Sequence, residues 1–229
     1  MVIGIIGAMD LEISGYLGEI KLIKKIAYAN LIFYVGKINS KKVVIVKSGA
    51  GKVNSALCAQ ILIDKFCVSA IIFTGVAGAL NKSLNVFDVV VLSDCIQHDI
   101  DATALGFEIG EIPFSKMKTI PSSKALSKLA LTSAKDQNLK VILGKGLTGD
   151  QFISSEEKNN YLREKFGGDC VDMESAAVAY VCFVNKIPFV IIRTISDGAN
   201  SSAKISFNVF FAQAAEHSKN IVLKMLEKM

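Results

Sequence analysis

Short apolar runs rich in valine and isoleucine alternate along this chain with longer segments of helical character, and this alternation constrains the fold more than any other feature. The runs that predict strands cover residues 2–6, 70–74, 86–92, 141–147 and 188–195. The segments that predict helices cover residues 11–17, 52–66, 121–136, 154–165, 173–185 and 206–228. Strands separated by helices indicate a sheet with helices on both of its faces. Residues 21–36 and 42–47 predict a meander, so the sheet should be mixed.

The chain has 229 residues, which is enough for one large core, and it contains no internal repeat, low-complexity segment or linker. We therefore expect a single α/β domain over residues 1–229, built in three layers with a central mixed β-sheet flanked by helices. Residues 94–119 have the weakest periodicity, and loops of that length inside a compact domain are usually functional.

Three local expectations can be checked against a structure. Gly75 should stop the strand at 70–74, and Pro121 should lie near the start of a helix, where proline is tolerated. The helix at 52–66 should turn one apolar face inward. That face is expected to carry Val53, Leu57, Ile61 and Leu62.

The composition favours self-association and argues against nucleic acid as a partner. Hydrophobic residues make up 51% of the chain, and the mean hydropathy of +0.42 is high for a monomer. An apolar interface between two copies would bury that surplus, so we expect a homodimer. The formal net charge is +5, but the lysines are scattered singly or in pairs, without a basic arm.

The cysteines and the N-terminal segment favour a cytoplasmic protein. The five cysteines form no C-x-x-C pair, and several lie inside apolar runs, which is typical of free thiols in a reducing compartment. The first ten residues have no basic cluster and predict a strand rather than a signal peptide. No apolar run reaches the roughly 18 residues of a membrane span, so we expect no membrane association.

Three acidic residues follow strongly apolar segments. Glu12 comes shortly after the first run, Glu174 opens an alanine-rich helical stretch, and Asp197 follows the run at 189–195. Carboxylates at the carboxyl ends of buried strands lie where open α/β sheets bind ligands. Each acid alone could be a helix-start or strand-end residue. Because burying an unpaired charge is costly, the three together indicate a site.

Two further motifs resemble a phosphate-binding loop and a zinc site, but neither meets the requirements of that site. Residues 48–53 (Ser-Gly-Ala-Gly-Lys-Val) fail the phosphate-loop pattern, because Val46 and Val53 stand where glycine and a hydroxyl residue are needed. A glycine turn before a helix still leaves backbone N–H groups beside a pocket. Residues 98–101 (His-Asp-Ile-Asp) offer too few ligands for a closed zinc site, so a hydrogen-bonded loop is favoured. We expect neither a metal nor a cofactor.

Seven short motifs follow one another along nearly the whole chain. They are residues 3–9 (Ile-Gly-Ile-Ile-Gly-Ala-Met) with Glu12, 47–53 (Lys-Ser-Gly-Ala-Gly-Lys-Val), 74–78 (Thr-Gly-Val-Ala-Gly), 98–101, 149–153 (Gly-Asp-Gln-Phe-Ile), 173–174 (Met-Glu) and 195–197 (Ile-Ser-Asp). In these motifs and their order the chain resembles the bacterial 5′-methylthioadenosine/S-adenosylhomocysteine nucleosidases of the nucleoside phosphorylase superfamily. The resemblance implies a nucleoside phosphorylase-like fold and hydrolysis of the N-glycosidic bond of adenine thioribosides, with 5′-deoxyadenosine as a further substrate. Adenine and a thioribose would be released, as in methionine salvage and nucleoside catabolism.

The resemblance also implies roles for individual residues. Asp197 is the general acid that protonates adenine N7, Glu12 is the general base for the attacking water, and Glu174 holds the ribose hydroxyls. Phe152 stacks on adenine, and Arg193 supports the water site. The other implied substrate-binding positions are Met9, Ala50, Val76, Ala77, Gly78, Ile153, Met173, Ser196 and Phe207, with Leu105 contributed by the partner subunit.

Three of these positions depart from the family pattern. Val76 stands where some members carry a serine near the water, and Ala50 and Leu105 replace bulkier residues often found around the 5′ group. The pocket for the thioalkyl group should therefore be roomier or less selective. The ranking of 5′-methylthioadenosine, S-adenosylhomocysteine, 5′-deoxyadenosine and aminodeoxyfutalosine as substrates stays open.

The chemistry of this bond is consistent with the proposed acids. Its cleavage builds positive charge on the sugar and negative charge on the leaving base. The base needs a proton from an acid that is still protonated near neutral pH, and burial can raise the pKa of Asp197 accordingly. The water needs a general base, and a carboxylate near the cationic ribose stabilises the transition state directly.

Two alternatives remain to be weighed. A purine nucleoside phosphorylase on the same fold would bind phosphate, usually through several arginines. Residues 1–162 contain no arginine, and Glu12 would repel phosphate, so hydrolysis is favoured. A non-catalytic binder of adenosine-like ligands or glycosaminoglycans is consistent with the basic balance, but it leaves the set of three acids without a role.

Overall fold

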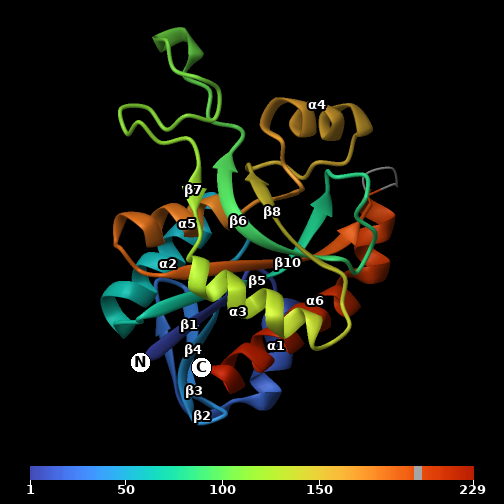
Figure 1. Cartoon of the computed structure of the whole chain (residues 1–229). Helices are drawn as coiled ribbons and strands as arrows, with labels where there is room; N and C mark the ends of the chain where they lie inside the picture. The colour runs from blue at the N-terminus through green and yellow to red at the C-terminus, as the bar shows by residue number, and fades with distance from the viewer. Residues whose placement is uncertain (199–202) are drawn as a thin grey trace.

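A computed structural model describes residues 1–198 and 203–229, apart from the side chains of residues 203–208. Within these residues ten strands form one sheet (Figure 1). The strands are β1 (Val2–Gly7), β2 (Lys21–Tyr28), β3 (Leu31–Ile38), β4 (Lys41–Lys47), β5 (Ala70–Ala79), β6 (Val89–Gln97), β7 (Ile120–Pro121), β8 (Val141–Thr148), β9 (Cys170–Asp172) and β10 (Phe189–Asp197). Their order is β10-β6-β8-β9-β5-β1-β4-β3-β2, with β7 paired to β6.

The sheet is mixed, as the sequence predicts. β1 runs parallel to its neighbours β4 and β5, whereas β2, β3 and β4 form an antiparallel meander. β10 pairs in parallel with β5 and antiparallel with β6. Because β10 joins both of these strands, β5, β10, β6, β8 and β9 close into a ring, and the remaining strands extend from it.

Helices cover both faces of the sheet, which confirms the predicted fold class (Figure 1). One face carries α2 (Lys52–Phe66) and α5 (Ser175–Val184), and the other carries α1 (Asp10–Glu19), α3 (Lys124–Lys135) and α6 (Ala203–Lys228). α4 (Glu156–Phe166) lies beside β8 and packs in a smaller cluster of its own. Among the described residues, no helix combines the length and apolar character that crossing a membrane requires.

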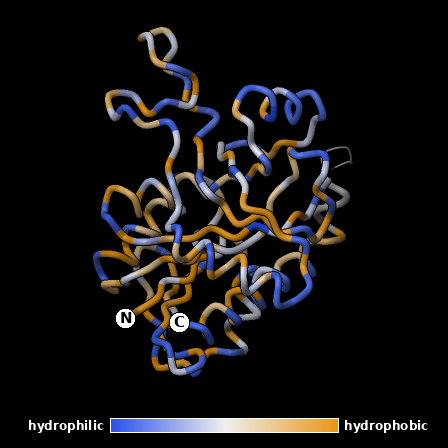
Figure 2. The backbone as a smooth tube through the Cα atoms, in the orientation of Figure 1, coloured by the Kyte–Doolittle hydropathy of each residue, from blue (hydrophilic) through white to orange (hydrophobic). Residues whose placement is uncertain are grey.

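The strands are apolar on both sides because each side is buried. Along β1, Ile3 and Ile5 pack under α1 and α6, while Ile6 packs under α2 and α5. Successive residues of a strand point to opposite faces, so a strand that is covered on both needs a continuous apolar run. Figure 2 shows hydrophobic residues concentrated in these central strands and hydrophilic ones over α4.

Two of the three local expectations prove wrong, and the third holds only for Ile61 and Leu62. β5 continues past Gly75 to Ala79, because β10 pairs with it as far as Gly78. Pro121 lies in β7, and α3 begins at Lys124, after Ser123 accepts a hydrogen bond from the Leu126 amide.

In α2 the exposed fractions of Val53 and Leu57 are 79% and 46%, so half of the predicted apolar face points outward. The helix instead buries its small residues Cys58 and Ala59 beside Leu62, and these residues allow α2 to pack closely against α5 and the sheet.

The weakly periodic stretch also differs in its bounds. β6 begins at Val89 rather than residue 86, and it runs on to Gln97 because β8 pairs with it throughout. The loop that follows contains the short 3-10 turn Thr103–Leu105, and it projects away from the body of the molecule (Figure 1).

Candidate active site

A cavity of about 270 Å³ lies at the carboxyl ends of β1, β5 and β10, where the parallel strands of the sheet meet. The segments that enter it from elsewhere are the glycine turn before α2, the loop after β8 and the turn between β9 and α5. The lining residues that had been proposed from the sequence are Met9, Glu12, Ala50, Val76, Ala77, Gly78, Phe152, Ile153, Met173, Glu174, Ser196 and Asp197. The three acids, distant along the chain, thus line a single cavity.

Glu12 is fixed by backbone groups from two strand ends. Its carboxylate accepts hydrogen bonds from the amides of Ala8 at 2.6 Å, Met9 at 3.0 Å and Val76 at 3.0 Å. Gly75 makes this approach possible, since a Cβ there would overlap Glu12 Oε1. Burial raises the pKa of Glu12 above its ordinary value, although Arg193 and the three amides act in the opposite direction.

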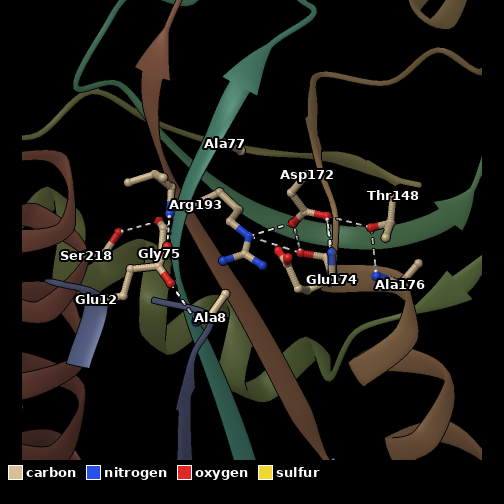
Figure 3. Close-up of polar contacts among 12 residues, drawn as sticks. Ala8, Glu12, Gly75, Ala77, Thr148, Asp172, Glu174, Ala176, Arg193 and Ser218 are labelled. Carbon is tan, nitrogen blue, oxygen red and sulfur yellow. Dashed lines mark hydrogen bonds and ion pairs between the residues drawn. The ribbon is translucent and has the colours of Figure 1, made fainter. Parts of the chain in front are cut away.

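Arg193 is the charged centre of the site (Figure 3). Its guanidinium is buried on β10 over the ring of Phe73, with 4.0 Å between the guanidinium carbon and the ring centroid. Its Nε donates to Asp172 Oδ2 at 2.7 Å and to Ser175 Oγ at 3.1 Å. Among the described residues, Arg193 Nη2 has no hydrogen-bond partner. Arg193 does not line the cavity itself and acts on it through the carboxylates beside it.

Asp172 is the charged residue of the cavity that was not proposed from the sequence. It lines the cavity, binds Arg193, and accepts hydrogen bonds from the Thr148 hydroxyl at 2.7 Å and from the amides of Glu174 and Ser175. These bonds hold the β9–α5 turn in place (Figure 3). Its position directly ahead of Met173 and Glu174 was the available signal, because a buried arginine needs a carboxylate partner. Ala8, Gln151 and Val171 also line the cavity without having been proposed.

Glu174 is the N-cap residue of α5, but its side chain bonds to the N-terminus of α2 rather than to α5. Its Oε1 accepts a hydrogen bond from the Gly51 amide at 2.8 Å. Burial and the negative charge of Asp172 raise the pKa of Glu174 to about 7, while Arg193 and the Gly51 amide oppose this shift. This carboxyl can therefore carry a proton near neutral pH.

Asp197 lies at the end of β10, after a register shift that turns the strand. Its Oδ1 accepts a hydrogen bond from the Ser196 hydroxyl at 2.7 Å, and its Oδ2 lies against Gly78, where a Cβ would be only 2.9 Å away. Burial raises the pKa of Asp197, and the Ser196 hydroxyl opposes this only in part. A buried carboxyl that keeps its proton can act as an acid.

Besides Arg193, two residues proposed from the sequence are not among the cavity-lining residues that the structure describes. Leu105 is on the projecting loop, 70% exposed, and does not line the cavity of its own chain. The side chain of Phe207, in α6, lies outside the described residues. Val76 packs against Phe211 of α6, as its apolar side chain allows.

The other titratable cluster noted in the sequence does not form a metal site. Among the described residues, no three histidine, cysteine, aspartate or glutamate side chains are placed to hold a metal ion. His98 is buried, and burial lowers its pKa, so that its imidazole is neutral at neutral pH.

We expect Glu174→Gln to change how stability depends on pH. With a pKa of about 7 when folded and 4.5 as its ordinary value, Glu174 holds its proton more tightly in the folded protein. Its protonation therefore stabilises the fold fully below about pH 4.5, and that contribution is lost as the pH rises to about 7. In urea unfolding between about pH 5 and 7, the variant should gain stability relative to the wild type as the pH rises. Glu19→Gln, an exposed change on α1, is the control, and parallel profiles for Glu174→Gln and the wild type would contradict the expectation.

Comparison with known proteins gives the family. A family model described as the phosphorylase superfamily matches residues 2–227. The aminodeoxyfutalosine nucleosidase of Campylobacter jejuni is 41% identical over 229 residues, which cover 100% of both chains. A 5′-methylthioadenosine/S-adenosylhomocysteine nucleosidase of Staphylococcus aureus (strain bovine RF122) is 40% identical over 228 residues, 99% of this chain and 100% of that protein.

A solved structure agrees. The Helicobacter pylori 5′-methylthioadenosine/S-adenosylhomocysteine nucleosidase with butyl-thio-DADMe-Immucillin-A superposes with a TM-score of 0.96 at 34% identity, covering 100% of this chain and 99% of that one. The resemblance found in the sequence motifs is therefore confirmed. The chain belongs to the phosphorylase superfamily and is an enzyme of its nucleosidase type.

Proposed function

We propose that this protein hydrolyses the N-glycosidic bond of 5′-methylthioadenosine and S-adenosylhomocysteine, and also of 5′-deoxyadenosine, to release adenine. The observation that carries the proposal is the convergence of Glu12, Glu174 and Asp197, each with a raised pKa, on one cavity. The relatives named above support the same reaction type. We place the reaction in methionine salvage and nucleoside catabolism.

In the proposed mechanism the three acids divide the work. Asp197 gives its proton to N7 of adenine while the bond between C1′ and N9 breaks, and the positive charge that develops on the ribose is stabilised by Glu174. Glu12 takes a proton from the water whose oxygen forms the new bond to C1′. The hydrogen bonds from the Ala8 and Val76 amides hold the Glu12 carboxylate in one orientation at the cavity. Phe152 and Ile153 bind the base, and Met173 and Met9 lie beside the sugar.

The cavity is unsuited to phosphate. Among the described residues, none of those that line it is a lysine or an arginine, and four are acids, Glu12, Asp172, Glu174 and Asp197. A phosphorylase needs cationic groups at this place, so the phosphorylase alternative is not favoured.

The function is tested by adenine release. We expect the purified protein to release adenine from 5′-methylthioadenosine, S-adenosylhomocysteine and 5′-deoxyadenosine at rates that do not depend on added phosphate. Aminodeoxyfutalosine belongs in the same panel, because one relative is named for it and the small residue Ala50 lines the cavity. Strict dependence on phosphate would refute the hydrolase, and binding without turnover would favour a nucleoside-binding protein.

The assignment of the acid and the base is tested by substitution. Asp197→Asn and Glu12→Gln should each lower kcat by roughly 10²–10⁴, the usual contribution of a proton-transfer group. Both changes keep the size of the side chain, so the variants should fold. Glu19→Gln, on the same helix as Glu12 but exposed, serves as the control. Near-native kcat in either site variant would remove that residue from the mechanism.

We further propose that the enzyme is a cytoplasmic homodimer in which Leu105 of the partner subunit closes the 5′ end of the pocket. Four of the five cysteines, all but Cys67, are buried free thiols, in keeping with a reducing compartment. Leu105 and Phe114 are 70% and 86% exposed on the projecting loop, and Val53 is exposed at the start of α2, three residues after the cavity-lining Ala50. An interface would bury these apolar side chains.

Removal of the Leu105 side chain tests this arrangement. Leu105→Ala should raise KM for 5′-methylthioadenosine by about tenfold, since a leucine contact with the thioalkyl group is worth about 1.5 kcal/mol. kcat should change less, because the acids are untouched. Leu22→Ala, an exposed leucine on β2, is the control. The proposal would be contradicted if the wild type were fully active but sedimented as a monomer in analytical ultracentrifugation, or if Leu105→Ala left KM unchanged.

A further inference from the structure

Three charged residues outside the catalytic set meet beside the cavity, and each comes from a different sequence motif. Lys52 follows the glycine turn, Asp99 follows His98, and Asp150 precedes the loop that carries Phe152. Lys52 Nζ lies 2.7 Å from Asp99 Oδ1, and the Asp150 amide donates to Asp99 Oδ2 at 2.9 Å. The Lys52 amide in turn donates to Asp150 Oδ1 at 2.8 Å. The three residues thus form a closed ring of contacts, called the circuit below.

The circuit supplies the cap that α2 lacks. The N-cap residue is Gly51, which has no side chain to accept a hydrogen bond from the first turn. Asp150 takes this role from another segment, and Glu174 accepts from the preceding amide, that of Gly51. The amides of Gly51 and Lys52 at this helix end thus bind two groups. Gly51 binds Glu174, which is proposed to hold the ribose, and Lys52 binds Asp150, next to the loop that carries Phe152.

The loop is also held from its other side. The imidazole of His98 packs on Gly149, where a Cβ would lie 2.5 Å from Nε2, and the Gly149 amide donates to the Asp172 carbonyl at 3.2 Å. The backbone before Asp150 therefore has little freedom. A displacement of Asp150 would move residues 151–153, which line the cavity.

The ion pair in the circuit is mostly shielded from solvent. The side chains of Lys52 and Asp99 are 19% and 17% exposed. Burial acts to raise the pKa of Asp99, but the ammonium of Lys52 and the Asp150 amide outweigh it and lower the pKa. Asp99 is therefore ionised at neutral pH, and both of its oxygens are engaged.

We propose that Lys52, Asp99 and Asp150 are positioning residues that fix the base-binding loop at 151–153 to the N-terminus of α2, and thereby set the base at a constant separation from Glu174. None of the three touches the reacting atoms. The inference rests on the proposed function, since it takes Phe152 and Ile153 as the adenine site. Small displacements of a bound substrate can cost on the order of 10²-fold in rate.

The experiment compares Lys52→Met and Asp99→Asn with the wild type, using 5′-methylthioadenosine for turnover and adenine for binding. kcat should fall roughly tenfold to a hundredfold in Lys52→Met, and the Kd of adenine should rise, because the loop no longer holds its position. Lys52→Arg, which can still reach Asp99, should restore most of both. Adenine binding is measured by calorimetry well below the Tm of each variant.

Arg163→Met provides the matched control. Arg163 pairs with Asp169 at the same distance of 2.7 Å, and that acid is 16% exposed, but the pair ties α4 to the segment before β9 instead of to the cavity. Its loss should lower Tm while kcat and adenine affinity stay within about twofold of the wild type.

Two outcomes overturn the inference: unchanged kcat and adenine affinity in Lys52→Met and Asp99→Asn, or an equal loss in Arg163→Met. A wild type that binds adenine but releases none from 5′-methylthioadenosine would refute the proposed function instead, and adenine affinity would still test the circuit.

Discussion

The buried pair of Arg193 and Asp172 is the interaction on which the site depends. Among the described residues, Arg193 is the only arginine or lysine that is buried, and four carboxyl groups line the cavity beside it. Asp172 takes the direct bond to the guanidinium. The positive charge of Arg193 lowers the pKa values of Glu12 and Glu174 only in part and is not among the causes of the shift of Asp197. Burial is the largest cause in all three and raises their pKa values. With a single buried cation among four acids, burial raises the pKa of Glu12 and Asp197, and it raises that of Glu174 to about 7 together with the charge of Asp172.

The topology delivers these groups to one place. β1, β5 and β10 run in parallel, so the residues after their carboxyl ends share one edge of the sheet. Glu12 is brought back onto that edge by the first turns of α1, and the register shift before Asp197 turns its side chain toward Gly78. Glycines at 75 and 78 leave room for the carboxyl groups that approach them. The apolar sheet therefore provides both the burial that shifts the acids and the rigid frame that holds them.

The sequence predicted the elements whose patterns are local and missed what depends on tertiary pairing. The alternation of apolar runs with helices, and the acids that follow those runs, were enough for the fold class and for candidate acids. Gly75 was misjudged because a glycine ends a strand only if no neighbour continues the ladder, and β10 does continue it. Val53 and Leu57 were misjudged because helical periodicity cannot tell a core from an unpaired surface. Asp172 was missed because its partner Arg193 lies 21 residues further along, and its place ahead of Met173 and Glu174 does not by itself identify that partner.

The glycine turn before α2 explains why the cavity does not suit phosphate. Its sequence fails the phosphate-loop pattern, yet the helix end that it creates is still an anion site, as the backbone amides and helix dipole require. In this protein the amides of Gly51 and Lys52 are already bound by Glu174 and Asp150. A phosphate at this helix end would have to displace two carboxylates and would meet a cavity lined with further acids. In many enzymes a helix end of this kind binds phosphate, but here the protein's own carboxylates occupy it. The cavity therefore favours water over phosphate as the nucleophile.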